Sequence, residues 1–161
     1  MRAEMLGVGT EADVDLKLND PGLVRLLKLW RDKAAGREMP AREDFQPPEF
    51  GSLLPAIALV DVTYDPMRFR WRLIGTDMTT VLGRDNTGKW FDDIYDDTTL
   101  AGFTAGMEFP VRLRRPVRLT GAASATGRSQ LGFEALTLPL SADGVVVNMV
   151  LVGARYLANA G

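Results

Sequence analysis

The chain has 161 residues, which is the size of one domain and long enough to bury a hydrophobic core. It is 46% hydrophobic and 25% charged, and its net charge of −2 offers no basic field for nucleic acid. The absence of cysteine and histidine excludes disulfides, thiol nucleophiles, a Ser-His-Asp relay and His-ligated haem. No signal peptide or membrane-spanning apolar run stands out, so we expect a cytoplasmic protein that contacts no membrane.

The first predicted element is a helix over residues 20–36. Residues 1–19 have no periodicity, and we expect a flexible arm there. Asp20 suits the N-cap, Pro21 the first helical position, and Gly36 the end of the helix. An apolar stripe at helical spacing must be buried, either on the chain's own sheet or across a homodimer. Its members, which are the candidate dimer interface, are Leu23, Leu26, Leu27 and Trp30.

Two strands are predicted after a proline-containing connector over residues 37–52. Residues 53–62 are almost all apolar, and residues 57–62 are apolar on both faces apart from Asp61, which predicts a central strand covered on both sides. Residues 69–73 alternate between apolar side chains and arginine, which predicts a strand with one buried face. Arginines on the other face favour an edge position. A short helix is predicted next, over residues 76–82, and Gly83 ends it.

A longer helix and three strands complete the chain. The helix starts near residue 97, and Pro110 is expected to kink or end it. The strands are predicted over residues 117–123, 131–138 and 145–152. An Asp-Gly pair at residues 143–144 indicates a hairpin before the last strand, whose nearly continuous apolar character predicts a central position. This order predicts an α+β fold with an antiparallel sheet in which the first and last of the five strands are adjacent at the centre.

Five motifs in the same order resemble the PAS domain family, in particular the small, mostly single-domain proteins common in alphaproteobacteria. They are LLKLWR (26–31), LLP with LVDV (53–55 and 59–62), FRWRLIGT (69–76), GRDNTG (83–88), and FEALTLPL with Asp-Gly (133–140 and 143–144). The resemblance implies a five-stranded antiparallel sheet of order 2-1-5-4-3, with helices between strands 2 and 3. It places the PAS-like domain at residues 37–157, after the arm and the N-terminal helix.

The resemblance also implies a non-catalytic sensor or signalling domain that binds a small ligand or a signalling protein. A covalent flavin–thiol adduct is impossible without cysteine, and the usual haem attachment is absent without histidine. The cofactor stays unknown: a non-covalent flavin, a fatty acid and a small carboxylate all remain open. No metal site is predicted. We expect a homodimer that uses the N-terminal helix.

A candidate ligand site is an apolar cavity between the sheet and the inserted helices. Its side chains either line such a cavity or simply fill the core, and both alternatives stay open. They are Trp71, Leu73, Met78, Phe91, Phe103, Met107 and Phe133. The candidate polar anchors are Arg72 and Glu134, and an inward-facing arginine would suit an acidic ligand. We expect these two side chains to pair with each other.

Two other functions remain open at this point. A small cone-like α+β enzyme of the isomerase or dehydratase type would need a carboxylate base inside an apolar cavity. Asp61 and Asp77 are the only carboxylates flanked by apolar segments. A ligand-free dimerisation module would instead have a completely filled core.

Overall fold

The computed structural model describes residues 2–3, 10–123 and 128–158. Its strands are β1 (Arg2–Ala3), β2 (Glu11–Asp13), β3 (Ile57–Thr63), β4 (Arg68–Ile74), β5 (Val117–Ala123), β6 (Arg128–Leu140) and β7 (Met149–Ala158). Its helices are α1 (Pro21–Ala34), α2 (Thr76–Leu82), α3 (Phe91–Ile94) and α4 (Asp97–Leu113), with the 3-10 helices η1 (Arg42–Asp44) and η2 (Pro47–Ala56). Pro110 lies in the last turn of α4 and does not end the helix early.

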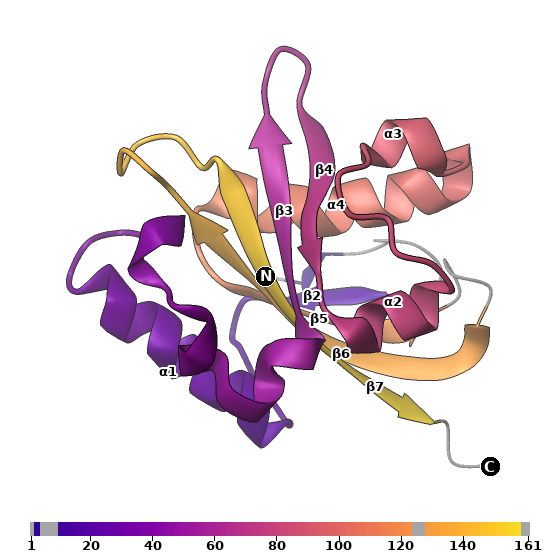
Figure 1. Ribbon diagram of the computed structural model, residues 1–161, viewed down its shortest axis with the longest axis horizontal. Coiled ribbons are helices and arrows are strands. Elements are labelled where there is room, and N and C mark those ends of the chain that lie inside the picture. Colours follow the sequence, from indigo (N-terminus) through magenta and orange to yellow (C-terminus); the bar gives the residue numbers. More distant parts are fainter. Residues whose placement is uncertain (1, 4–9, 124–127, 159–161) are drawn as a thin grey trace.

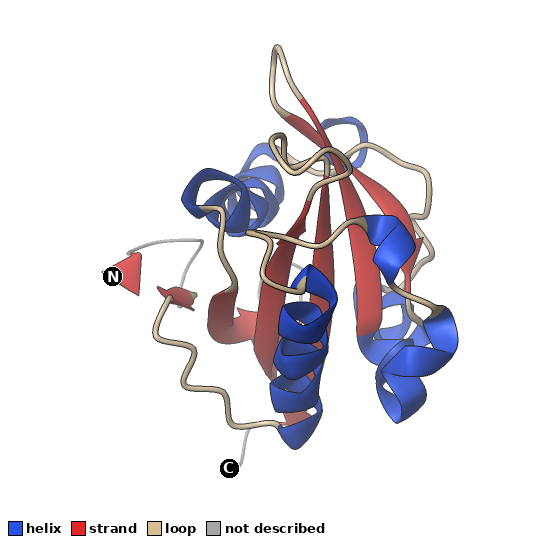
Figure 2. Cartoon of the chain, turned by 90° about the vertical axis from the view of Figure 1, so that its left-hand side faces the viewer, coloured by secondary structure: helices blue, strands red, loops and turns tan. Residues whose placement is uncertain are grey.

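One antiparallel sheet forms the centre of the molecule, with strand order β1-β2-β5-β6-β7-β3-β4. Figure 1 shows α1 on one side of the sheet and α2 and α3 on the other, and Figure 2 shows the strands side by side as a layer. The five strands from β3 onward have the predicted order 2-1-5-4-3, so the α+β, PAS-like fold class is confirmed. The arginine-rich strand β4 lies at the edge, as its pattern indicates.

The segment before α1 differs from the flexible arm that we expected. Strand β2 pairs with β5 along its whole length, and Ala12 and Val14 are buried. Three residues are too few to predict a strand from their pattern. The edge of β5 nevertheless has unpaired backbone groups with which this short segment can form hydrogen bonds. Residues 4–9 of the predicted arm lie outside the described residues.

Helix α1 packs on the chain's own sheet. The Asp20 side chain caps it by accepting a hydrogen bond from the Leu23 backbone N–H, at 3.0 Å. Leu23 and Leu26 lie over Gly153 in β7, where an added Cβ would come within 2.6 Å of Leu26 Cδ2. Trp30 Nε1 donates to the Pro139 carbonyl at 3.0 Å.

This packing corrects the prediction of the dimer interface. Leu23, Leu26, Leu27 and Trp30 are all buried inside the chain, and none is more than 7% exposed. The apolar stripe predicted that this face of the helix is buried, but it did not identify the surface that covers it. In the structure, that surface is the sheet of the same chain. A homodimer remains a prediction and would have to use other side chains.

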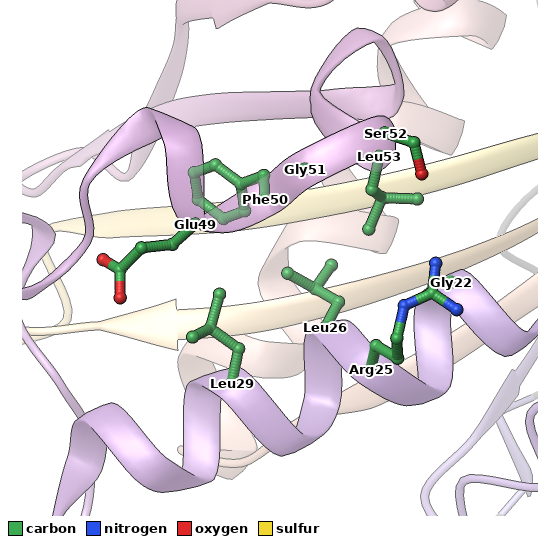
Figure 3. Close-up of a pocket in the computed structure, with 9 residues that line it drawn as sticks. All are labelled: Gly22, Arg25, Leu26, Leu29, Glu49, Phe50, Gly51, Ser52 and Leu53. Carbon is green, nitrogen blue, oxygen red and sulfur yellow. The ribbon is translucent and has the colours of Figure 1, made fainter.

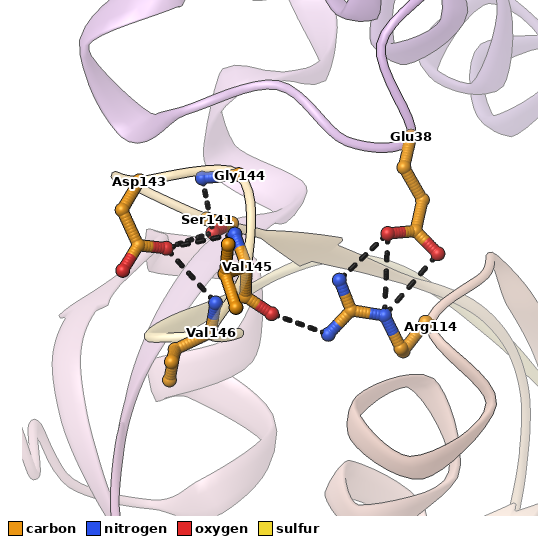
Figure 4. Close-up of polar contacts among 7 residues, drawn as sticks. All are labelled: Glu38, Arg114, Ser141, Asp143, Gly144, Val145 and Val146. Carbon is orange, nitrogen blue, oxygen red and sulfur yellow. Dashed lines mark hydrogen bonds and ion pairs between the residues drawn. The ribbon is translucent and has the colours of Figure 1, made fainter.

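Strand β7 is central, as expected, but starts at Met149 rather than at residue 145. The carboxylate of Asp143 accepts hydrogen bonds from the backbone N–H groups of Val145 and Val146, at 2.8 and 2.9 Å. Arg114, held by Glu38, donates to the Val145 carbonyl at 2.5 Å (Figure 4). These polar groups are therefore satisfied inside the turn, and the two valines do not join the sheet. Within the described residues, no helix is both long and apolar enough to cross a membrane.

Candidate functional site

Five aromatic rings meet between the sheet and helices α3 and α4. Trp71 and Phe91 have ring centroids 4.9 Å apart, and Tyr95 and Phe103 stack at 4.8 Å. The remaining ring, Phe69, lies 5.9 Å from Phe91. We call Phe69, Trp71, Phe91, Tyr95 and Phe103 the aromatic cluster. Three of its members are predicted cavity residues, whereas the sequence analysis missed Phe69 and Tyr95.

The other predicted cavity residues are not all at this cluster. Met78 and Met107 are buried in the same continuous core. Phe133 is half-buried and lies opposite Tyr156 in the sheet. The prediction that Leu73 lines the cavity is wrong, because this residue is 39% exposed and its side chain does not face the cluster.

A β-bulge explains the position of Leu73. The register of β3 with β4 passes from Leu59 opposite Leu73 directly to Val60 opposite Trp71, so Arg72 is the extra residue. An extra residue reverses the alternation of side chains beyond it. Leu73 therefore faces away from Trp71, although a plain alternating pattern puts both on one face.

A polar group lies inside the aromatic cluster. The indole Nε1–H of Trp71 donates to the Tyr95 hydroxyl oxygen at 3.0 Å, and the Asn86 side chain also bonds that hydroxyl. Burial raises the pKa of Tyr95 above its usual value, although the hydrogen bonds from Trp71 and Asn86 act in the opposite direction. The Tyr95 hydroxyl therefore stays protonated at neutral pH.

Asn86 is the exceptional residue of this site. It is only 4% exposed, and its Oδ1 has no hydrogen-bond partner among the described residues. Buried polar groups are nearly always paired, so this unpaired end calls for an explanation.

The loop between α2 and α3 carries Asn86 to the cluster. Gly83, with φ of 83°, ends α2 in the left-handed conformation. Beyond it, the Gly88 N–H donates to the Trp71 carbonyl at 2.6 Å, and the Trp71 N–H donates to the Lys89 carbonyl at 3.0 Å. The loop is thus paired to the outer edge of β4 at Trp71, which fixes Asn86 beside the indole.

Tyr156 adds a second phenol on the same face of the sheet. Burial raises its pKa to about 12, and the nearby Asp77 and Tyr95 act in the same direction. Its hydroxyl is therefore a neutral hydrogen-bonding group at any physiological pH.

The predicted pairing of Arg72 with Glu134 is wrong. Glu134 pairs with Arg118, at 2.7 Å, and the Arg72 guanidinium is mostly exposed and 3.9 Å from Asp61. Strands β4 and β6 are separated by β3 and β7, so the two side chains cannot meet. Neither residue belongs to the aromatic cluster. Glu134 is on β6 and contacts the start of α1, on the other face of the sheet, and the Arg72 side chain is exposed to solvent.

Glu134 instead anchors the start of α1. Its two carboxylate oxygens accept hydrogen bonds from the Asn19 and Asp20 backbone N–H groups, both at 2.8 Å. Burial alone would raise the pKa of this carboxyl, but the bonds from Asn19, Arg118 and Asp20 outweigh it and hold the pKa below its ordinary value. Asp20 in turn bonds Arg155 at 3.1 Å, so charged groups on three strands hold this end of the helix.

The two candidate catalytic bases do not have the surroundings that catalysis needs. Asp61 accepts two hydrogen bonds from Arg70, at 3.1 and 2.9 Å, and is therefore neutralised. Asp77 is exposed to solvent. A carboxylate base needs an apolar site without a neighbouring cation, and neither residue lies in one.

Comparison with known families gives the class of the protein. The sheet order and the helices between β4 and β5 define an α+β sensory-type module, and the model of the PAS domain family matches residues 18–152. The chain belongs to the PAS domain family. This membership indicates a sensor or signalling module, a class whose members are generally non-catalytic. Comparison with the curated proteins and with the solved structures found no match.

Proposed function

We propose that this chain is a non-catalytic PAS sensor that binds a small molecule between the sheet and helices α2–α4. The observation that carries the proposal is the unpartnered end of the Asn86 amide. Leaving a buried polar group unpaired costs about 1–3 kcal/mol, and a polar group on a ligand would recover that cost. A buried amide beside five aromatic rings suits a ligand with a flat apolar body and one hydroxyl or N–H group.

Helix α3 is the segment that we expect to move when the ligand enters. It has only four residues, and Phe91 on it contributes the most buried ring of the aromatic cluster. Its outer side is held by an ion pair between Arg68 and Asp92, at 2.8 Å, which is exposed and therefore contributes little stability. Displacing α3 would let a ligand ring replace one of the chain's own rings without disrupting the sheet.

The ligand signal would then pass to the outside through β4. Trp71 is bonded to the loop after α2 on one side and is paired with Val60 of the central strand β3 on the other. A ligand that shifts Trp71 or Asn86 therefore changes the exposed surface of this loop. A protein partner that contacts the loop would detect the change.

Replacing Asn86 with leucine tests the proposal. The variant loses a bond to Tyr95 but also loses the unpaired polar end, so its free energy of unfolding should stay within about 1 kcal/mol of the wild type. Binding should be lost, because leucine offers no polar group. Native mass spectrometry of the purified wild-type protein should show a bound small molecule that is absent from Asn86→Leu.

Asn148→Leu is the matched control. The Asn148 Oδ1 accepts from the Ala142 backbone N–H at 3.0 Å in the turn before β7, so this amide is satisfied. The control should lose about 1 kcal/mol of stability and keep the bound molecule. Equal retention of the bound mass in both variants would contradict the role that we give to Asn86.

A further inference from the structure

A concave site lies on the opposite face of the sheet from the aromatic cluster, between α1 and η2. Its volume is about 180 Å³. Leu26 and Leu29 of α1 form one wall, and Phe50 and Leu53 of η2 form the other (Figure 3). We call this the α1–η2 groove. The groove is apolar along its length and carries charged side chains at its rim.

The charges at the rim do not cancel. Glu49 pairs with Lys33 at 2.5 Å and also accepts from the Gln46 backbone N–H. The hydrogen bond from Lys33 lowers the pKa of Glu49, so this carboxylate is ionised and already compensated. In the part of the chain that the structure describes, Arg25 forms neither an ion pair nor a side-chain hydrogen bond. The groove therefore has one uncompensated positive charge.

The two charged residues lie at different ends of the groove. Figure 3 shows the Arg25 guanidinium toward Ser52 and Leu53, whereas the Glu49 carboxylate points away at the other end. A ligand that lies along the apolar walls thus meets an uncompensated cation and a hydroxyl at one end, and the compensated Lys33–Glu49 pair at the other. Arginine binds a carboxylate through two parallel hydrogen bonds. A carboxylate ligand is therefore favoured over a small spherical anion such as chloride.

We propose that the α1–η2 groove binds a small monocarboxylate with a short unbranched apolar tail. The carboxylate pairs with Arg25, and the tail lies against Leu26, Leu29 and Phe50. An apolar cavity of about 150 Å³ holds a benzene molecule, so the groove accommodates a tail of about six carbons. The proposal does not depend on the function proposed for the aromatic cluster, because the sheet separates the two sites.

Hexanoate is the probe for this site, and 1-hexanol is its neutral counterpart. Methyl NMR of the full chain should show saturable shifts at Leu26 and Leu29 as hexanoate is added. Arg25→Gln should weaken hexanoate binding at least tenfold. Hexanol should bind the wild type several-fold more weakly than hexanoate and should bind Arg25→Gln as well as it binds the wild type.

Arg31→Gln is the matched control, because Arg31 is exposed on the same helix but does not line the groove. It should bind hexanoate like the wild type. The proposal is overturned if hexanoate causes no saturable shift, if hexanol binds equally well, or if the two arginine variants behave alike. Shifts at the Trp71 indole instead of at Leu26 and Leu29 would also overturn it and would leave the proposed function intact.

Discussion

Replacing Glu134 with alanine is expected to lower the free energy of unfolding by about 3–5 kcal/mol, because the largely buried Arg118 guanidinium loses its closer partner and keeps only the 3.6 Å contact with Asp13. The Glu134 side chain is 5% exposed and that of Arg118 is 15% exposed. The same substitution removes the acceptor of the Asn19 and Asp20 backbone N–H groups, which come directly before α1. Urea-induced unfolding followed by tryptophan fluorescence measures the loss.

Glu108→Ala is the control for this prediction. Glu108 pairs with Arg112 one helical turn away on the exposed side of α4, and such pairs contribute about 0.3–0.5 kcal/mol. The account is contradicted if the two alanine variants are destabilised equally.

The pH dependence of stability gives a second readout for the same residue. The pKa of Glu134 is lowered in the folded protein, so its contribution is complete above the ordinary glutamate value of 4.5 and is lost as the pH falls through the folded pKa. Glu134→Gln carries no titrating group at this position. Its free energy of unfolding should therefore fall less steeply than that of the wild type below the ordinary value.

Gly75→Ala is the second substitution with a large expected effect. Gly75 lies between β4 and α2, and an added Cβ would overlap the Pro55 carbonyl oxygen and come within 2.7 Å of the Ile57 carbonyl oxygen. These are backbone atoms at the end of η2 and the start of β3, which cannot move aside as a side chain can. The Gly75 N–H also donates to the Ile57 carbonyl at 2.7 Å, so a shift would break this bond. We expect the unfolding free energy to fall by about 3 kcal/mol, a large loss for overpacking.

Gly106→Ala is the matched control in α4. A Cβ at residue 106 would lie 3.3 Å from Leu119 Cδ1, the flexible end of a side chain. Alanine is favoured over glycine inside a helix by about 0.5–1 kcal/mol, so this variant should stay within about 1 kcal/mol of the wild type. Comparable losses in both variants would show that the contact at Gly75 is not the cause.

The strand order followed from the sequence because hydrophobicity reports burial directly. The apolar segments that became β3 and β7 indicated two central strands, and the arginines of β4 indicated an edge. The same signal was misleading for Val145 and Val146. The Asp143 carboxylate accepts hydrogen bonds from their backbone N–H groups, which are then not free to pair with a neighbouring strand. A hydrogen bond from one side chain leaves no periodic pattern in the sequence.

The candidate site was predictable in its aromatic part and not in its polar part. The alternation in residues 69–73 indicated that Trp71 faces inward, but the bulge at Arg72 turned Leu73 away. A buried polar residue in a loop, such as Asn86, has no periodic signal at all. The Arg72–Glu134 pair could have been excluded beforehand, because the predicted strand order already placed two strands between them.

The position of α1 illustrates the same limit of periodicity. Its apolar stripe indicated that one face is buried, but a stripe does not identify the surface that covers it. Gly153 was the available signal, because a glycine inside an otherwise apolar central strand indicates close approach of another element. Leu23 and Leu26 occupy the space above it.

The central claim is that a small polar molecule completes the hydrogen bonding of Asn86 inside the aromatic cluster. The most direct measurement is an NMR titration of the Trp71 indole N–H with phenol, which has a flat ring and one hydroxyl, and with toluene, which has none. Phenol should shift the resonance saturably in the wild type but not in Asn86→Leu, and toluene should have little effect. A phenol response that persists in Asn86→Leu, or one that toluene reproduces, would contradict the account.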